Sequence, residues 1–493
     1  MPNHLRAGGL PLARFRTARH GYVYDAATNQ ILRLPDDLWQ RLPALLRNSG
    51  APLPRLLARL QREAGVLSPQ RPARVTARSV PHDGDRLFSL ILNVTEACNI
   101  RCGYCVYGGA YMGKRAHGNR RMTLETAKRA IDHLARHDAN TAYPFRMLGW
   151  YGGEPLMNFA LIRESAACFK SVFSGHEARF HLTSNAVHWP DAVLDFLIAE
   201  KVDLVISLDG PQPVHDRNRT GPKGEGTHSR VMESIARLRA RSESYFRRHV
   251  TLNAVGTAPL DLVELDRFFS EFPVQAALSS VEPTQFTPAT DPLPARGWPE
   301  MKAKFLKGCL SGTFETPAFR ERGYAFVYYL FIRDMERLHR RIVDTGFPET
   351  LEGFSNCAPG QERLFVSTDG TFETCEKTEG CARMRLGNVT DGVSAQAVTR
   401  IYRGFNALGH ASCRSCFNLR LCRICFAHAQ MGDGFSSAKR AWNCRTLRAR
   451  TREMLSLYCE ILERDPTALN FISERLPATG RSAVPARRPT ADP

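Results

Sequence analysis

Between residues 86 and 309, short apolar runs alternate with segments that have the periodicity of helices. This repetition predicts an α/β fold with a parallel sheet. The expected strands are Leu87–Leu92, Met147–Tyr151, Arg179–Thr183, Leu204–Ser207, Val250–Val255 and Val274–Ser279. Helices are expected to begin between them near Thr123, Asn158, Pro190, His228 and Pro259. Six repeats indicate a partial (βα)6 TIM-like barrel, in which reacting groups sit at the C-terminal ends of the strands.

Three cysteines with the spacing CxxxCxxC, Cys98, Cys102 and Cys105, follow the first predicted strand. This spacing supplies three thiolates to a cluster of four irons and leaves the fourth iron open. An open iron can chelate a small molecule through amino and carboxylate groups. The alternatives are a zinc site, although zinc ribbons favour paired CxxC knuckles, and a disulfide, which would leave one thiol unpaired.

Glycines and short polar residues follow the next three predicted strands. These candidate ligand-binding residues are Gly152, Gly153, Glu154, Pro155, Ser184, Asn185, Ser207 and Asp209. The two glycines would let the backbone approach a ligand, and Glu154 would accept a hydrogen bond from an ammonium group. The polar side chains after the third and fourth strands could hold hydroxyl and carboxylate groups. Turn capping is the alternative for Asn185, Ser207 and Asp209.

The cysteine motif, with Tyr104 before its last cysteine, and the Gly-Gly-Glu-Pro stretch together resemble the signature of the radical S-adenosylmethionine (radical SAM) enzymes. The resemblance implies that a reduced 4Fe-4S cluster cleaves bound S-adenosylmethionine to a 5′-deoxyadenosyl radical, which removes hydrogen from an unactivated C–H bond. The eight candidate ligand-binding residues would then hold S-adenosylmethionine. A flavodoxin or ferredoxin is the expected electron donor.

The chain has 14 cysteines, and ten of them lie beyond residue 300. Their pattern resembles the SPASM extension of radical SAM peptide maturases, with one departure, a closing CxxC where the family more often has CxxxC. By the family's wiring, the first auxiliary 4Fe-4S cluster would be held by Cys357, Cys375, Cys381 and Cys425. The second would be held by Cys413, Cys416, Cys422 and Cys444. At Cys381, water or a substrate thiol could occupy the position instead.

Three clusters would use eleven cysteines, because a closed 4Fe-4S cluster needs four thiolates. The remaining cysteines, Cys168, Cys309 and Cys459, lie in apolar, helix-like surroundings and are expected to be packing residues. Thiol-rich clusters require a reducing compartment, which predicts a cytoplasmic protein. No signal peptide or membrane-spanning run is visible, and no membrane association is expected.

The N-terminal segment, residues 1–80, is expected to form a winged-helix-like module. Tyr22–Tyr24 and Ile31–Leu34 form a predicted hairpin, followed by a helix that begins near Pro35 and a second helix from about Leu53 to Ala64. The first of these helices is expected to bury Leu38, Trp39, Leu42, Leu45 and Leu46. A hairpin followed by helices resembles the leader-recognition domain of maturases, which would accept a peptide by strand addition. A structural cap is the alternative.

The expected domains are therefore the N-terminal module at 1–80, the barrel at 86–310, a helical linker at 311–356, the SPASM domain at 357–460 and a disordered tail at 476–493. The net charge is +18, from 67 Lys and Arg against 49 Asp and Glu. Because the basic residues are dispersed, nucleic-acid binding is not expected. An acidic leader peptide fits the charge, and an Arg-rich but merely solvated surface is the alternative.

The implied activity is post-translational modification of a ribosomally made precursor peptide, by a thioether or carbon–carbon cross-link. An anaerobic sulfatase-maturase-like protein oxidase is the runner-up. In those enzymes an Asp that acts as a base follows the GxxxxC cysteine. Here that position is Glu376, which makes it the candidate catalytic base, and a solvated glutamate is the alternative. A noncatalytic metal-binding peptide scaffold is a third hypothesis, against which the intact motifs argue.

Overall fold

The computed structural model describes residues 10–47, 54–67, 71–72, 74–77, 86–137, 143–280, 295–316, 319, 326–353 and 357–474. Within these ranges the chain forms an α/β fold on a large mixed sheet of ten strands. The tail predicted at 476–493 lies outside the described residues.

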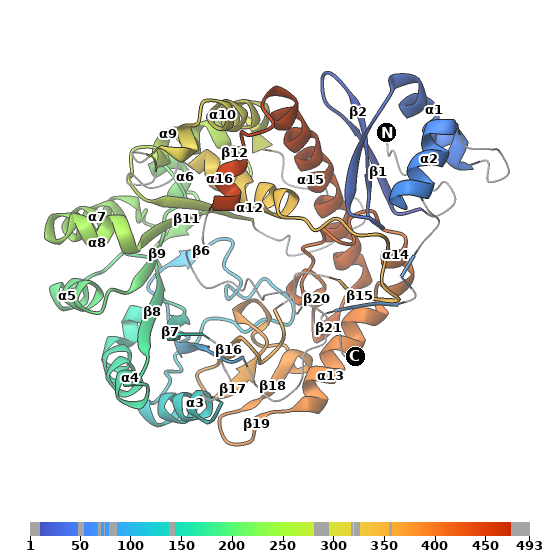
Figure 1. Ribbon diagram of the computed structural model, residues 1–493. Coiled ribbons are helices and arrows are strands. Elements are labelled where there is room, and N and C mark those ends of the chain that lie inside the picture. The colour runs from blue at the N-terminus through green and yellow to red at the C-terminus, as the bar shows by residue number, and fades with distance from the viewer. Residues whose placement is uncertain are drawn as a thin grey trace.

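Six parallel strands form one part of the sheet, in the order β13-β11-β9-β8-β7-β5 (Figure 1). Their bounds are Ser89–Thr95 for β5, Phe145–Gly152 for β7, Glu177–Ser184 for β8, Asp203–Ser207 for β9, Val250–Gly256 for β11 and Gln275–Ser280 for β13. Each overlaps a strand expected from the sequence, so the six-strand pattern is confirmed. Buried Leu, Ile and Val residues fill these strands because a parallel sheet is covered on both faces.

Helices between these strands cover the outer face of the sheet (Figure 1). They are α3 (Leu124–Arg136), α4 (Phe159–Val172), α5 (Asp191–Ala199), α6 (Gln212–His215), α7 (His228–Arg241), α8 (Glu243–His249) and α9 (Leu262–Phe269). Local capping fixes several of their starts. Thr123 accepts a hydrogen bond from the backbone N–H of Thr126, and Asp261 accepts from Val263 and Glu264.

The cysteine-rich C-terminal part extends the same sheet, which the sequence did not predict. Strand β16 (Arg363–Val366) pairs in parallel with β5, and β17 (Thr371–Glu373), β18 (Arg385–Asn388) and β19 (Gly392–Val393) follow antiparallel. Beyond them lie α13 (Ala395–Ala407), α14 (His410–Arg414), the hairpin of β20 (Gln430–Met431) and β21 (Gly434–Phe435), α15 (Ser437–Arg464) and α16 (Asn470–Glu474). The shared sheet places the C-terminal part beside the first barrel strand.

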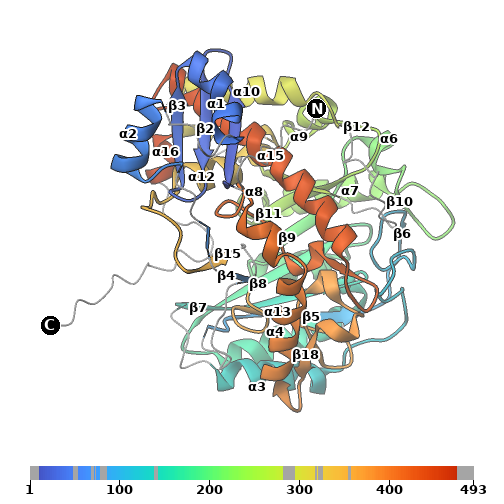
Figure 2. The same ribbon diagram turned by 90° about the vertical axis from the view of Figure 1, so that its right-hand side faces the viewer.

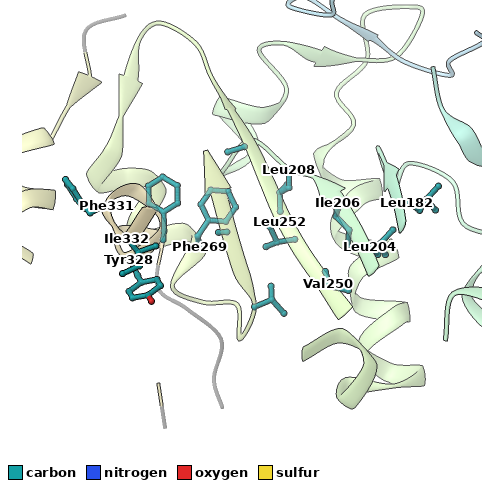
Figure 3. Packing of buried hydrophobic residues seen from close by; sticks show 14 of the residues in the cluster. Leu182, Leu204, Ile206, Leu208, Val250, Leu252, Phe269, Tyr328, Phe331 and Ile332 are labelled. Atoms are coloured by element: carbon teal, nitrogen blue, oxygen red, sulfur yellow. The ribbon is translucent and has the colours of Figure 1, made fainter. Parts of the chain in front are cut away.

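The segment expected as a helical linker, 311–356, packs into the main core through α12 (Phe326–His339), which contacts α15 and β13. Helix α10 (Trp298–Leu310), at the end of the expected barrel, also lies beside α15. Figure 3 shows Tyr328, Phe331 and Ile332 of α12 near Phe269 of α9. The open edge of the barrel is therefore covered by helix α12.

The N-terminal module has three antiparallel strands and two helices. They are β1 (Leu12–Arg16), β2 (Gly21–Asp25), β3 (Gln30–Leu34), α1 (Asp36–Arg47) and α2 (Arg55–Ala64). Figure 2 shows the module, in blue, near α15. Strand β1 was missed because arginines interrupt its apolar residues. Arg14 is accommodated because its guanidinium lies 3.9 Å from the centre of the Trp39 ring.

A small separate core holds this module together. It buries Leu42 of α1 as expected, while Trp39, Leu45 and Leu46 are partly buried against it. Leu38 is also buried, as expected, but outside this cluster. Gly65 ends α2 with φ of 66°, as expected of a C-terminal glycine. Farther along the chain, β4 (Arg74–Ala77) pairs with β15 (Thr350–Gly353). The winged-helix and SPASM assignments stay predictions.

Candidate active site

A cavity of about 340 Å³ lies at the C-terminal ends of the barrel strands. Its walls come from the loop after β5, the ends of β7, β8, β9, β11 and β13, and the C-terminal part of the chain. The cavity thus occupies the place where barrel enzymes carry their reacting groups.

Cys98, Cys102 and Cys105 all line this cavity. Burial raises the pKa of the Cys98 thiol to about 12 and that of Cys102 to about 11. As the side chains stand, no three His, Cys, Asp or Glu residues in the described ranges are close enough together to hold a metal ion. The donor set nonetheless fits an iron–sulfur cluster, because three soft sulfur ligands face one cavity.

Gly152 and Gly153 let the end of β7 pack closely against the start of the cysteine loop, the segment after β5 that carries Cys98, Cys102 and Cys105. A Cβ on Gly152 would lie 2.2 Å from the carbonyl oxygen of Thr95, and one on Gly153 would lie 2.1 Å from that of Ala97. The backbone N–H of Gly153 donates to Thr95 at 2.8 Å. Both glycines line the cavity, and the close approach that requires them is to the chain's own backbone.

The carboxylate of Glu154 is buried at the cavity wall. It accepts hydrogen bonds from the Ser184 hydroxyl at 2.9 Å and from the backbone N–H of Asn185 at 2.8 Å. Burial raises its pKa to about 7, and these hydrogen bonds oppose that rise. Glu154 therefore ties the end of β7 to the end of β8.

Ser184, Asn185 and Ser207 also line the cavity, so the structure brings six of the eight candidate ligand-binding residues together. Asn185 accepts from the backbone N–H of Val187 at 3.0 Å, which is a turn-capping contact. Its amide also donates to the Cys98 sulfur at 3.8 Å. Asn185 thus caps a turn and contacts the cysteine group at once.

The remaining two candidates, Pro155 and Asp209, are buried but do not line the cavity. Asp209 accepts from the Tyr104 hydroxyl at 2.6 Å and forms an ion pair with Arg219 at 3.1 Å. Arg219 does line the cavity, and sequence reasoning missed it. It lies ten positions after Asp209, and no motif spacing signalled that the two would meet.

The C-terminal part supplies the opposite wall of the cavity, which the sequence also did not predict. Lys377, His428, Gln430, Met431 and Lys439 line it. Residues of the cysteine loop reach across to this wall. The Lys114 ammonium donates to the carbonyl of Lys377 and to the side chain of Gln430.

Four of the C-terminal cysteines lie close enough together for the charge of each thiolate to influence the others. Burial raises the pKa of Cys413 to about 11, with further contributions from Cys416 and Cys444. Burial likewise raises the pKa of Cys422, and the same three thiols add to it. Arg440 donates to the Cys413 sulfur at 3.4 Å. These are the four residues expected to hold the second auxiliary cluster.

The four cysteines expected to hold the first auxiliary cluster are brought together only in part. Burial raises the pKa of Cys375 to about 12, with contributions from Glu376 and Cys425. The sulfur of Cys381 is buried and donates to Asp433 at 3.7 Å. Cys357 is exposed. The singletons Cys168, Cys309 and Cys459 pack against the main core, which confirms that expectation.

Glu376, the candidate base, lies in the short 3-10 helix η4 (Glu376–Thr378) and does not line the cavity. Its carboxylate accepts from Arg363 at 2.7 Å. Burial raises the pKa of the phenol of Tyr151, a cavity residue, and the charge of Glu376 contributes to the rise. The Glu376 carboxylate is therefore held by an ion pair close to a residue of the cavity wall.

Comparison with known proteins identifies the domain that carries this site. Residues 92–264 match the model of the Radical SAM superfamily, so the chain contains a radical SAM domain, as the motifs predicted. The structure resembles native anSMEcpe with bound AdoMet and Kp18Cys peptide. The TM-score is 0.54 at 17% identity, and the match covers 78% of this chain and 99% of that one. At this identity the likeness shows the fold.

Two relatives match in sequence. An uncharacterised protein of Methanocaldococcus jannaschii is 31% identical over 126 residues, which are 26% of this chain and 40% of that protein. The serine-type anaerobic sulfatase-maturating enzyme of Bacteroides thetaiotaomicron is 24% identical over 186 residues, 38% of this chain and 44% of that enzyme. The matches thus span less than half the length of these relatives. No helix in the described ranges is long and apolar enough to cross a membrane.

Proposed function

We propose that this protein is a radical SAM enzyme that modifies a ribosomally made peptide. The observation that carries the proposal is the shared cavity. Its walls include the three motif cysteines, the Gly-Gly-Glu turn, the polar ends of β8 and β9, and residues of the cysteine-rich C-terminal part. A cofactor site and a second, substrate-facing wall would therefore border the same cavity.

Cys98, Cys102 and Cys105 would hold a 4Fe-4S cluster whose open iron binds S-adenosylmethionine. Together, when bound, these groups supply a 5′-deoxyadenosyl radical that takes a hydrogen atom from the substrate. Ser184, Asn185 and Ser207 offer hydroxyl and amide groups on the wall beside the thiols. Glu154 holds Ser184 and Asn185 in place, so its role is to orient the neighbours of the ligand.

A peptide substrate is supported by the second wall. Lys377 and Lys439 of that wall and Lys114 of the cysteine loop bring ammonium groups to the cavity, while Glu154 is the carboxylate among its lining residues. A solved relative in fold, anSMEcpe, has been captured with both AdoMet and a peptide. We propose an acidic precursor peptide, cross-linked through a thioether or carbon–carbon bond. The electrons would come from a flavodoxin or ferredoxin.

The C-terminal cysteines would hold two auxiliary 4Fe-4S clusters. The mutual influence of Cys413, Cys416, Cys422 and Cys444 supports the second cluster. The nearness of Cys375 and Cys425 supports the first. There, Cys381 and Cys357 would complete the ligand set, and a substrate thiolate could replace Cys381.

A second candidate function is oxidation of a protein side chain, as in sulfatase maturation. The partial identity to a serine-type anaerobic sulfatase-maturating enzyme favours it. Glu376 would then act as the base. Its ion pair with Arg363, at 2.7 Å, would hold the carboxylate in a fixed position.

Anaerobically reconstituted protein, reduced and given S-adenosylmethionine, is expected to release 5′-deoxyadenosine. Replacing Cys98, Cys102 and Cys105 together with Ala should abolish the release. Replacing the packing residues Cys168 and Cys309 with Ala is the matched control and should leave it intact. Release that continued in the triple variant would refute the proposal. Zinc without acid-labile sulfide in the wild type would indicate a noncatalytic scaffold instead.

A further inference from the structure

A buried arginine contacts one of the three motif sulfurs. The Nη1 of Arg219 donates to the Cys102 sulfur at 3.8 Å. The contact is set by the backbone, because β10 (Arg219–Thr220) pairs antiparallel with β6 (Arg101–Cys102) and places Arg219 directly opposite Cys102. The position of the guanidinium is therefore coupled to that of the cysteine loop.

Asp209 holds this guanidinium in place. The Nε of Arg219 lies 3.1 Å from Oδ1 of Asp209, and the two side chains are only 7% and 2% exposed. Asp209 is itself fixed by the Tyr104 hydroxyl at 2.6 Å and by the backbone N–H of Val255 at 3.0 Å. The carboxylate does not reach the cavity, whereas Arg219 does. Asp209 therefore acts through Arg219.

We propose that Arg219 is a positioning residue that raises the reduction potential of the cluster held by Cys98, Cys102 and Cys105, an inference that rests on the proposed function. A cationic N–H donor to a cysteine sulfur favours the reduced cluster, which carries one more negative charge. Asp209 keeps the guanidinium aimed at Cys102, in place of the ligand contact that the sequence predicted for it.

The test is a redox titration of the anaerobic, reconstituted full chain, followed by electron paramagnetic resonance. The relevant signal is the one that changes when S-adenosylmethionine is added, because only the cluster with an open iron binds it. Arg219→Gln should move its potential to a more negative value. We expect at least a tenfold fall in the equilibrium constant of one-electron reduction, equivalent to about 59 mV.

Arg217→Gln is the matched control. It removes the same charge from the same segment, but Arg217 is exposed and donates to the carbonyl of Pro259 rather than to sulfur. The potential of this variant should equal that of the wild type. If Arg219→Gln does not retain the cluster, Arg219→Lys, which keeps the charge but not the forked donor, is titrated instead, and its potential should be more negative than that of the wild type. Loss of the cluster from both variants would overturn the inference, because Arg219 would then be required to hold the cluster and not to set its potential.

An unchanged potential in a variant with wild-type iron content would overturn the inference. An unchanged potential with weaker binding of S-adenosylmethionine in equilibrium dialysis would also overturn it, because Arg219 would then contact the ligand itself. Absence of the responsive signal from the wild type would overturn the proposed function, and this inference with it. That failure is distinguishable because it does not depend on a variant.

Discussion

Arg115, in the loop that carries the motif cysteines, and Glu379, in the C-terminal part, form an ion pair with a distance of 2.9 Å between Nε and Oε2. The two side chains are 8% and 4% exposed. Glu379 also accepts from the Ser367 hydroxyl at 3.0 Å and from the Asn93 amide of β5. One buried carboxylate therefore joins the first barrel strand, the cysteine loop and the C-terminal part, which together surround the cavity.

Glu379→Gln should lower the stability of the protein markedly. The substitution leaves the Arg115 guanidinium buried without its countercharge, and removing one partner of a buried ion pair costs about 3–5 kcal/mol. The measurement is the urea midpoint of the anaerobic protein. The matched control is Glu125→Gln on α3, whose exposed pair with Arg129 is worth about 0.3–0.5 kcal/mol. Equal midpoints for the two variants would contradict the structural role of Glu379.

Gly153→Ala should displace the cysteine loop. The new methyl group would lie 2.1 Å from the carbonyl oxygen of Ala97, and backbone atoms cannot rotate away as a side chain can. We expect loss of the first cluster and of 5′-deoxyadenosine release, while the auxiliary clusters remain. Iron analysis should therefore show a decrease of roughly one-third.

Gly175→Ala provides the control for this change. A Cβ at Gly175 meets no atom within 4 Å, so that variant should keep its full iron content and its activity. A fully active Gly153→Ala variant would mean that the turn can shift without disturbing the cysteine loop.

The variant in which Cys98, Cys102 and Cys105 are all Ala should retain roughly two-thirds of the wild-type iron, because two of three equal clusters would remain. The measurement is iron and acid-labile sulfide per chain after reconstitution. An iron content near zero would point to a single cluster and a zinc-bound C-terminal part.

The sequence predicted the six barrel strands because a parallel strand is buried on both faces and reads as a continuous apolar run, as in Leu90-Ile91-Leu92 of β5. It did not predict that β16 extends the same sheet. A strand carries no sequence signal for its neighbour when hundreds of residues separate the two, as they do for Leu90 and its partner Leu364. Strand β1 was missed because Arg14 and Arg16 mask its pattern.

The sequence predicted those parts of the candidate site that belong to motifs with a characteristic residue spacing. The three cysteines and the Gly-Gly-Glu turn were found in this way, and the structure places them around one cavity. Arg219, Lys377 and Lys439 were not found. They are single basic residues in a chain with 67 Lys and Arg, and only tertiary packing distinguishes them from the solvated ones.

The N-terminal module offers a position at which peptide recognition can be separated from chemistry. In its sheet, β1 contacts α15, while β3 is the strand at the opposite edge. Arg33 lies on β3 and is exposed. The module contributes no residue to the cavity. Deleting Met1–Pro69 would remove this edge, but it would also remove the partners of Glu463 in α15, namely the hydroxyls of Thr17 and Tyr22.

Arg33→Glu should therefore weaken modification of an acidic peptide without affecting cleavage of S-adenosylmethionine in the absence of peptide. A negative charge beside the free edge of β3 would repel an acidic strand that adds there. We expect about a tenfold rise in KM for the peptide, equivalent to about 1.4 kcal/mol. The control is Arg19→Glu, which reverses an exposed charge in the turn between β1 and β2 and not on β3. Both activities are measured on one preparation of known iron content. Wild-type KM values for both variants would show that β3 does not bind the leader, and the module would then be a structural cap.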